Sequence, residues 1–82
     1  MKVQEVFREM VRFAKANSGR VDIAYYVSGS QKKKTMLEKM LQKYIEDADI
    51  DFELGILNKD EHFAEMEVAK VIENSLKNYQ VY

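Results

Sequence analysis

Residues 28–38, SGSQKKKTMLE, decide the organisation of this chain, because they join two segments of different hydrophobic periodicity. Gly29 allows backbone angles that other residues rarely adopt, so it favours a tight turn. Farther along, Thr35 and Glu38 have the spacing of a capping box, in which each side chain bonds to the other residue's backbone N–H. The stretch therefore predicts a turn followed by a helix that begins at Met36.

The residues before this junction predict a helix and then a strand. Apolar residues recur at three- and four-residue spacings over residues 3–14, which is typical of an amphipathic helix. Residues 17–19, Asn-Ser-Gly, favour the end of a helix, so we expect it to close near Ala16. Residues 20–28, RVDIAYYVS, are rich in β-branched and aromatic side chains and predict a strand covered on most of both faces.

The residues after the junction predict a helix, a second strand and a last helix. The helix that begins at Met36 carries an apolar stripe and ends near Ala48. Residues 49–57, DIDFELGIL, alternate between apolar and acidic side chains and predict a half-exposed strand in which Gly55 marks a bulge. Asn58 and Glu61 form a second capping box, so we expect the last helix to run to about residue 78. The inward side chains of the second strand would be Ile50, Phe52, Leu54 and Ile56.

The predicted order, helix-strand-helix-strand-helix, indicates one small α/β domain formed by residues 1–82. Two strands joined through a helix fit a parallel, right-handed βαβ unit. Because a two-stranded sheet is poorly self-sufficient, we expect a homodimer to complete the sheet or its helical layer. The alternative is a winged helix-turn-helix, with residues 20–28 helical, residues 51–68 forming a hairpin, and residues 32–43 as the recognition region.

Composition narrows the function classes. The chain has 13 Lys+Arg and 14 Asp+Glu, for a net charge of -1, so no global field draws it to nucleic acid or anionic lipid. It has no cysteine, which excludes disulfides and thiolate sites and fits a cytoplasmic protein. No apolar run approaches the ~20 residues that a membrane helix needs, and the first residues lack a signal-peptide pattern, so we expect no membrane association.

The sequence also offers little catalytic or metal-binding chemistry. His62 is the only histidine, and no serine stands in a nucleophile-elbow pattern. Residues 47–53 carry four carboxylates and begin like a calcium loop, but Phe52 occupies the position of the required glycine. We therefore expect no enzymatic activity, no metal and no cofactor.

The first candidate binding site is the lysine-rich loop of the junction. Backbone N–H groups, a helix N-terminus, hydroxyls and lysines suit an anion, such as a nucleic-acid phosphate or a phosphorylated ligand. The candidate residues are Gly29, Ser30, Lys32, Lys33, Lys34, Thr35, Lys39 and Lys43. The loop lacks the glycine spacing of a phosphate-binding loop, so a solvated lysine segment is the alternative interpretation.

The second candidate site is a protein contact surface. It would use the acidic face of the second strand and the tyrosines, of which Tyr25 and Tyr26 point to opposite faces of the first strand. The candidate residues are Tyr25, Tyr26, Asp49, Asp51, Glu53, Tyr79 and Tyr82. The sequence thus predicts a small non-enzymatic regulatory or inhibitory module that binds another protein, with nucleic-acid or phosphorylated-ligand binding as the alternative.

Overall fold

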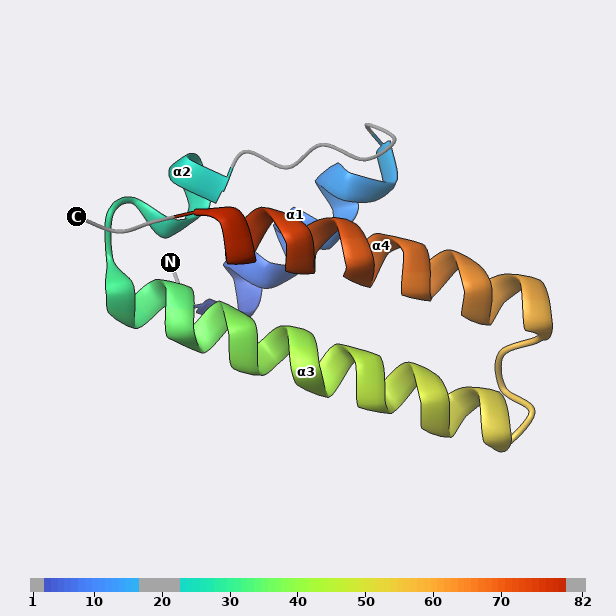
Figure 1. Cartoon of the computed structure of the whole chain (residues 1–82). Coiled ribbons are helices and arrows are strands. Elements are labelled where there is room, and N and C mark those ends of the chain that lie inside the picture. Colours follow the sequence, from blue (N-terminus) through green and yellow to red (C-terminus); the bar gives the residue numbers. More distant parts are fainter. Residues whose placement is uncertain (1–2, 17–22, 80–82) are drawn as a thin grey trace.

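The chain folds as a bundle of helices. The computed structural model describes residues 3–16 and 23–79, and within these ranges it contains four helices and no strand. The helices are α1 (Val3–Ala16), α2 (Ile23–Val27), α3 (Gln31–Glu53) and α4 (Lys59–Asn78). The two long helices, α3 and α4, run antiparallel as a hairpin, α1 packs across both of them, and α2 lies near the beginning of α3 (Figure 1).

The core lies in one half of this bundle. The buried face of α1 consists of Val6, Phe7, Met10 and Ala14, at the spacings that the sequence predicted for an amphipathic helix. These side chains meet the first half of α3, the second half of α4 and the short α2. The buried residues from those helices are Ile23, Tyr26, Val27, Leu37, Leu41, Ala69, Ile72 and Leu76.

The first predicted strand is wrong. Residues 23–27 form α2, and residues 20–22 of that prediction lie outside the described residues. Ile23, Tyr26 and Val27 are buried, and their spacing of three and four places them on one face of a helical turn. The β propensity of this segment is overridden because packing of that face onto α1 and α3 buries more than a lone strand would.

The second predicted helix begins earlier than expected. Ser30, not Thr35, is the N-cap of α3, and its side-chain oxygen accepts a hydrogen bond of 3.2 Å from the backbone N–H of Lys33. Thr35 and Glu38 lie inside the helix, so the predicted capping box at that position is wrong. Residues 31–34, QKKK, are good helix formers, and a serine directly before them is enough to start the helix.

The second predicted strand is also wrong, because α3 continues through most of it to Glu53. The chain then turns with Gly55 at a φ of 77°, where its N–H donates to the carbonyl oxygen of Phe52. The N–H of Ile56 donates to the carbonyl oxygen of Asp51 over 2.8 Å, which completes a Schellman motif. Gly55 is therefore the residue that ends a helix and not a bulge in a strand.

The first and last helices are confirmed. α1 closes at Ala16, and α4 starts behind a complete capping box in which Asn58 and Glu61 each accept from the other's backbone N–H. The α/β class, the βαβ unit and the winged alternative are overturned, because no described residue belongs to a strand. The stated reason for a homodimer, an incomplete sheet, falls away with the sheet. No helix in the described ranges is long and apolar enough to cross a membrane.

Candidate functional site

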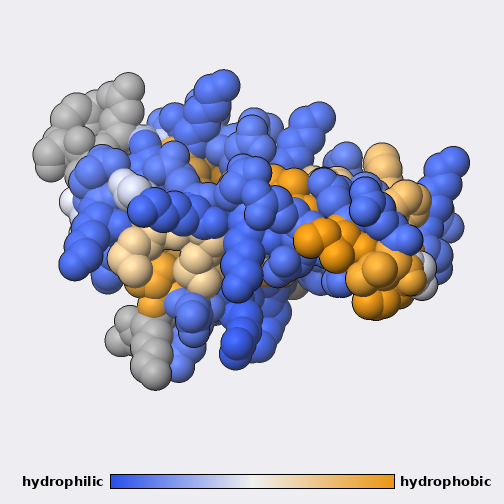
Figure 2. Space-filling view, turned by 90° about the horizontal axis from the view of Figure 1, so that it is seen from below, coloured by the Kyte–Doolittle hydropathy of each residue, from blue (hydrophilic) through white to orange (hydrophobic). Residues whose placement is uncertain are grey.

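Large apolar side chains are exposed where α3 turns into α4. Ile50, Phe52, Leu54, Ile56 and Phe63 are 51%, 41%, 69%, 64% and 65% exposed, and we call them the tip cluster. In Figure 2, which looks onto the side of α3, hydrophobic atoms gather at the end of the molecule that carries this turn. Together they expose on the order of 500 Å², and exposed apolar area of this size often serves binding.

The tip cluster is exposed because the hairpin is longer than the helix that covers it. Lys15, in the last turn of α1, pairs with Glu65 of α4 over 3.0 Å, and this contact marks how far α1 reaches. Of the residues between Ala48 and Ala69, all of which the structure describes, none is buried. From Glu65 to the turn, α4 packs only on α3 among residues 3–16 and 23–79 (Figure 1).

A polar contact and a ring contact fix the tip from within. The His62 Nε2 atom of α4 lies 2.8 Å from the Asp49 Oδ1 atom of α3. The His62 ring also packs on Phe52, with ring centroids 4.5 Å apart. Together these contacts hold the two ends of the hairpin in register, although both polar side chains remain partly exposed and the polar contact itself stabilises little.

The tip cluster lies in a strongly acidic part of the chain. Between residues 46 and 67, Lys59 is the one lysine or arginine against nine acidic residues, whereas ten of the 13 Lys+Arg precede residue 44. The acidic residues are Glu46, Asp47, Asp49, Asp51, Glu53, Asp60, Glu61, Glu65 and Glu67. The net charge of -1 is therefore the sum of a basic first half of the sequence and a strongly acidic segment at residues 46–67.

The charges on α3 are placed against its own dipole. Its first turn has no acidic residue and carries Lys32 and Lys33, while its last turn has no basic residue and carries Asp51 and Glu53. Lysines at a helix N-terminus and carboxylates at a C-terminus each cost some stability, and they add to the field of the helix instead of offsetting it. At the tip the positive N-terminus of α4 offsets the negative C-terminus of α3, so the carboxylates themselves set the sign of the potential there.

The predicted acidic contact residues lie at the C-terminal end of α3. Asp49 and Glu53 are exposed and Asp51 is partly buried, all on α3 and not on a strand. Asp49 pairs with His62. Nowhere in residues 3–16 and 23–79 do three or more His, Asp or Glu side chains come together in an arrangement that could hold a metal ion.

The residues of the predicted lysine loop have different environments in the structure. Gly29 has a φ of 72°, Ser30 caps α3, and the exposed Thr35 accepts a long hydrogen bond of 3.4 Å from Gln31. Lys34 is half-buried and donates to the Tyr79 carbonyl oxygen over 2.6 Å, where its charge suits the C-terminus of α4.

The remaining lysines of that prediction are exposed. Lys32, Lys39 and Lys43 are separated by seven and four residues, close to whole helical turns, so they form one row along α3. Lys33 lies off this row. Three of the predicted lysines therefore form an exposed row on one face of α3. Lys34 makes a contact within the fold.

The predicted tyrosine contacts are spread over the bundle. Tyr26 is buried in the core, whereas Tyr25 is 69% exposed and packs edge-on against the Tyr26 ring at 5.2 Å. Tyr79 caps the C-terminus of α4 and is partly buried. Tyr82 lies outside the described residues. None of the three described tyrosines belongs to the tip cluster.

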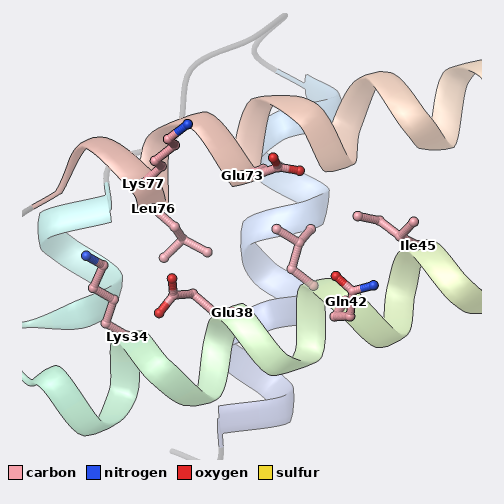
Figure 3. A pocket seen from close by; sticks show the side chains of 8 residues that line it. Lys34, Glu38, Gln42, Ile45, Glu73, Leu76 and Lys77 are labelled. Carbon is pink, nitrogen blue, oxygen red and sulfur yellow. The ribbon is translucent and has the colours of Figure 1, made fainter.

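A shallow pocket of about 400 Å³ lies between the first half of α3 and the second half of α4. Leu41, Ile45 and Leu76 supply its apolar part, and Figure 3 shows side chains of both charges around it. The polar lining residues are Lys34, Glu38, Gln42, Glu73 and Lys77. No lining residue is a histidine, serine, threonine or cysteine.

The fold is thus a four-helix arrangement, and its most distinctive surface is the apolar, acidic end of the α3–α4 hairpin. No family model matches the chain, and no curated protein or solved structure matches it either. The sequence analysis found the acids of this surface but assigned Ile50, Phe52, Leu54 and Ile56 to a buried strand face. The uneven distribution of acids and lysines along the chain was the signal that could have found it.

Proposed function

We propose that this protein is a non-enzymatic binding module that recognises another protein through the tip cluster. The observation that carries the proposal is the exposure of five large apolar side chains on the part of the hairpin that α1 does not cover. Exposed aliphatic and aromatic groups in one patch are costly for solubility, and they gain free energy when a partner removes them from water.

The geometry suits binding better than catalysis. The residues of the tip cluster lie on a convex helix turn, whereas small-molecule sites are concave. The chain has no cysteine, which suits action in the reducing cytoplasm. A small regulatory or inhibitory protein needs only such a surface on a stable scaffold, and the core at the other half of the bundle supplies the scaffold.

The test is affinity capture from a native lysate with wild-type protein and a tip variant, Leu54→Gln/Phe63→Gln. Glutamine keeps helix propensity while removing the apolar surface. Met36→Gln is the matched control, because Met36 is an exposed apolar residue of α3 near the other end of the helix. We expect a protein retained by the wild type and the control, in nuclease-treated lysate, and lost with the tip variant. Equal retention by the tip variant contradicts the proposal.

The lysine row supports a second candidate function, binding of nucleic acid or a phosphorylated ligand. Lys32, Lys39 and Lys43 present three charges along one face of α3, and phosphate contacts depend on such rows. The same capture distinguishes it. Retained material that disappears on nuclease treatment, and with Lys32→Gln/Lys39→Gln/Lys43→Gln, would favour this second function over the first. Lys59→Gln/Lys70→Gln/Lys77→Gln removes the same charge elsewhere and is its control.

A further inference from the structure

Resting on the proposed binding function, we infer the chemistry of the partner: a basic amphipathic helix, with an apolar face for the tip cluster and lysines or arginines beside it. The tip cluster alone fits any apolar partner. The charges around it select among them, because they are almost all of one sign.

A basic segment is favoured by the side-chain charges at the tip. Nine acidic side chains and one lysine occupy residues 46–67, so the surroundings of the tip cluster offer carboxylates to cationic groups. The helix dipoles add little, because the negative C-terminus of α3 and the positive N-terminus of α4 lie at the same end of the hairpin. A cationic partner would therefore be steered to this end and would meet complementary charges there.

A helical form suits a surface that combines apolar and acidic groups. The tip cluster is carried by two antiparallel helix ends and the turn between them, with carboxylates next to it in the sequence. An amphipathic helix presents an apolar face through residues spaced by three and four, and its neighbouring positions can carry the matching cations.

The same charges disfavour the other occupants. A second copy docked tip to tip would bring two acidic ends together, and like charges across an interface cost several kcal/mol. An anionic membrane surface would be repelled by the same carboxylates. The wild-type protein should therefore show no association that depends on the tip cluster when alone.

The test is fluorescence anisotropy with a labelled synthetic peptide of about 18 residues, with leucines at i, i+3, i+4 and i+7 and lysines elsewhere. A twin peptide carries glutamates in place of the lysines. We expect the lysine peptide to bind the wild type, more weakly as salt rises, and the glutamate peptide not to bind.

Two variants with equal net charge separate a local from a global effect. The tip-charge variant is Glu46→Gln/Asp47→Asn/Glu53→Gln/Asp60→Asn, which spares the Asp49 pair and the capping glutamate. The matched control is Glu5→Gln/Glu9→Gln/Glu38→Gln/Glu73→Gln. The tip-charge variant should bind the lysine peptide about ten- to a hundredfold more weakly, and the control within about threefold of wild type.

Equal binding of both peptides, or equal loss in both charge variants, overturns the inference. So does tip-dependent dimerisation of the wild type in sedimentation equilibrium. Another outcome is that the lysine peptide does not bind while Leu54→Gln/Phe63→Gln still abolishes capture of a cellular protein. In that case the inferred partner chemistry is wrong and the proposed binding function stands. If capture itself does not depend on the tip cluster, the proposed function fails first.

Discussion

Replacing Lys33 with glutamate should stabilise the protein. Lys33 is the third residue of α3, exposed, and its backbone N–H donates to the side chain of the N-cap, Ser30. The N–H of Ser30 already donates to the Val27 carbonyl oxygen over 3.1 Å, so a glutamate at this position would act through its charge and not as a second cap. It would exchange a positive for a negative charge at the positive end of the helix dipole.

The expected gain follows from the charge reversal alone. Reversing an exposed charge in the first turn is worth about 0.5–1 kcal/mol. A gain of this size should raise the melting temperature of a domain of this length by roughly 2–8 °C. Thermal and urea unfolding followed by circular dichroism at the helical band would measure it.

Three companion variants identify the source of the gain. Lys33→Ala removes the positive charge without adding a negative one and should give about half of the gain. In the Ser30→Ala background, Lys33→Glu should give a similar gain, because the charge acts on the helix dipole and does not need the cap side chain. Thr35→Ala should be close to neutral, because Thr35 lies inside α3. A Lys33→Glu protein no more stable than wild type, or a loss of about 1 kcal/mol in Thr35→Ala, would refute a helix start at Ser30.

Two further predictions concern the turn and the core. Gly55→Ala should destabilise the protein by about 1–2 kcal/mol in urea unfolding, because a φ of 77° is strained for any residue with a Cβ atom. Lys59→Ala, at an exposed site nearby, is the control. An equal loss of stability in both variants would contradict the Schellman turn. Ile72 is fully buried in the core, so Ile72→Ala should lower the free energy of unfolding by about 2–5 kcal/mol and Ile72→Val by about 0.5–1.5 kcal/mol. A loss below about 1 kcal/mol for the alanine variant would contradict that packing.

The sequence predicts the helices whose signals are local and consistent. α1 has an unbroken three-four periodicity, and α4 has both residues of its capping box at the right spacing. Neither segment contains a competing pattern, so local propensity, capping and amphipathicity favour the same structure.

The segments that were wrongly predicted as strands carry signals for both a strand and a helix. In residues 49–57, apolar and acidic residues alternate like a strand, yet the run follows 18 helical residues without a glycine or proline to stop it. A helix extends one hydrogen bond at a time once it is nucleated, so it continues until Gly55 offers a left-handed exit. The alternation then has no face to bury, and its apolar side chains stay exposed.

The exposed apolar residues of the tip were missed for the same reason. The predicted strand buried Ile50, Phe52, Leu54 and Ile56 on its inner face, so they were not among the predicted contact residues. Whether an apolar residue is exposed depends here on the length of α1 relative to the hairpin, which is a tertiary property. Charge polarity along the chain needs no tertiary information, and it points to the same end of the molecule.

The turn between α3 and α4 also bears on the entropy of binding. Its backbone is held on both sides, by the Schellman hydrogen bonds of Gly55 and Ile56 and by the reciprocal Asn58–Glu61 cap. Leu54 and Ile56 are therefore displayed from a loop that is ordered before any partner arrives. An association there would have to restrict side-chain rotamers but little backbone, which lowers the conformational cost of a modest contact area.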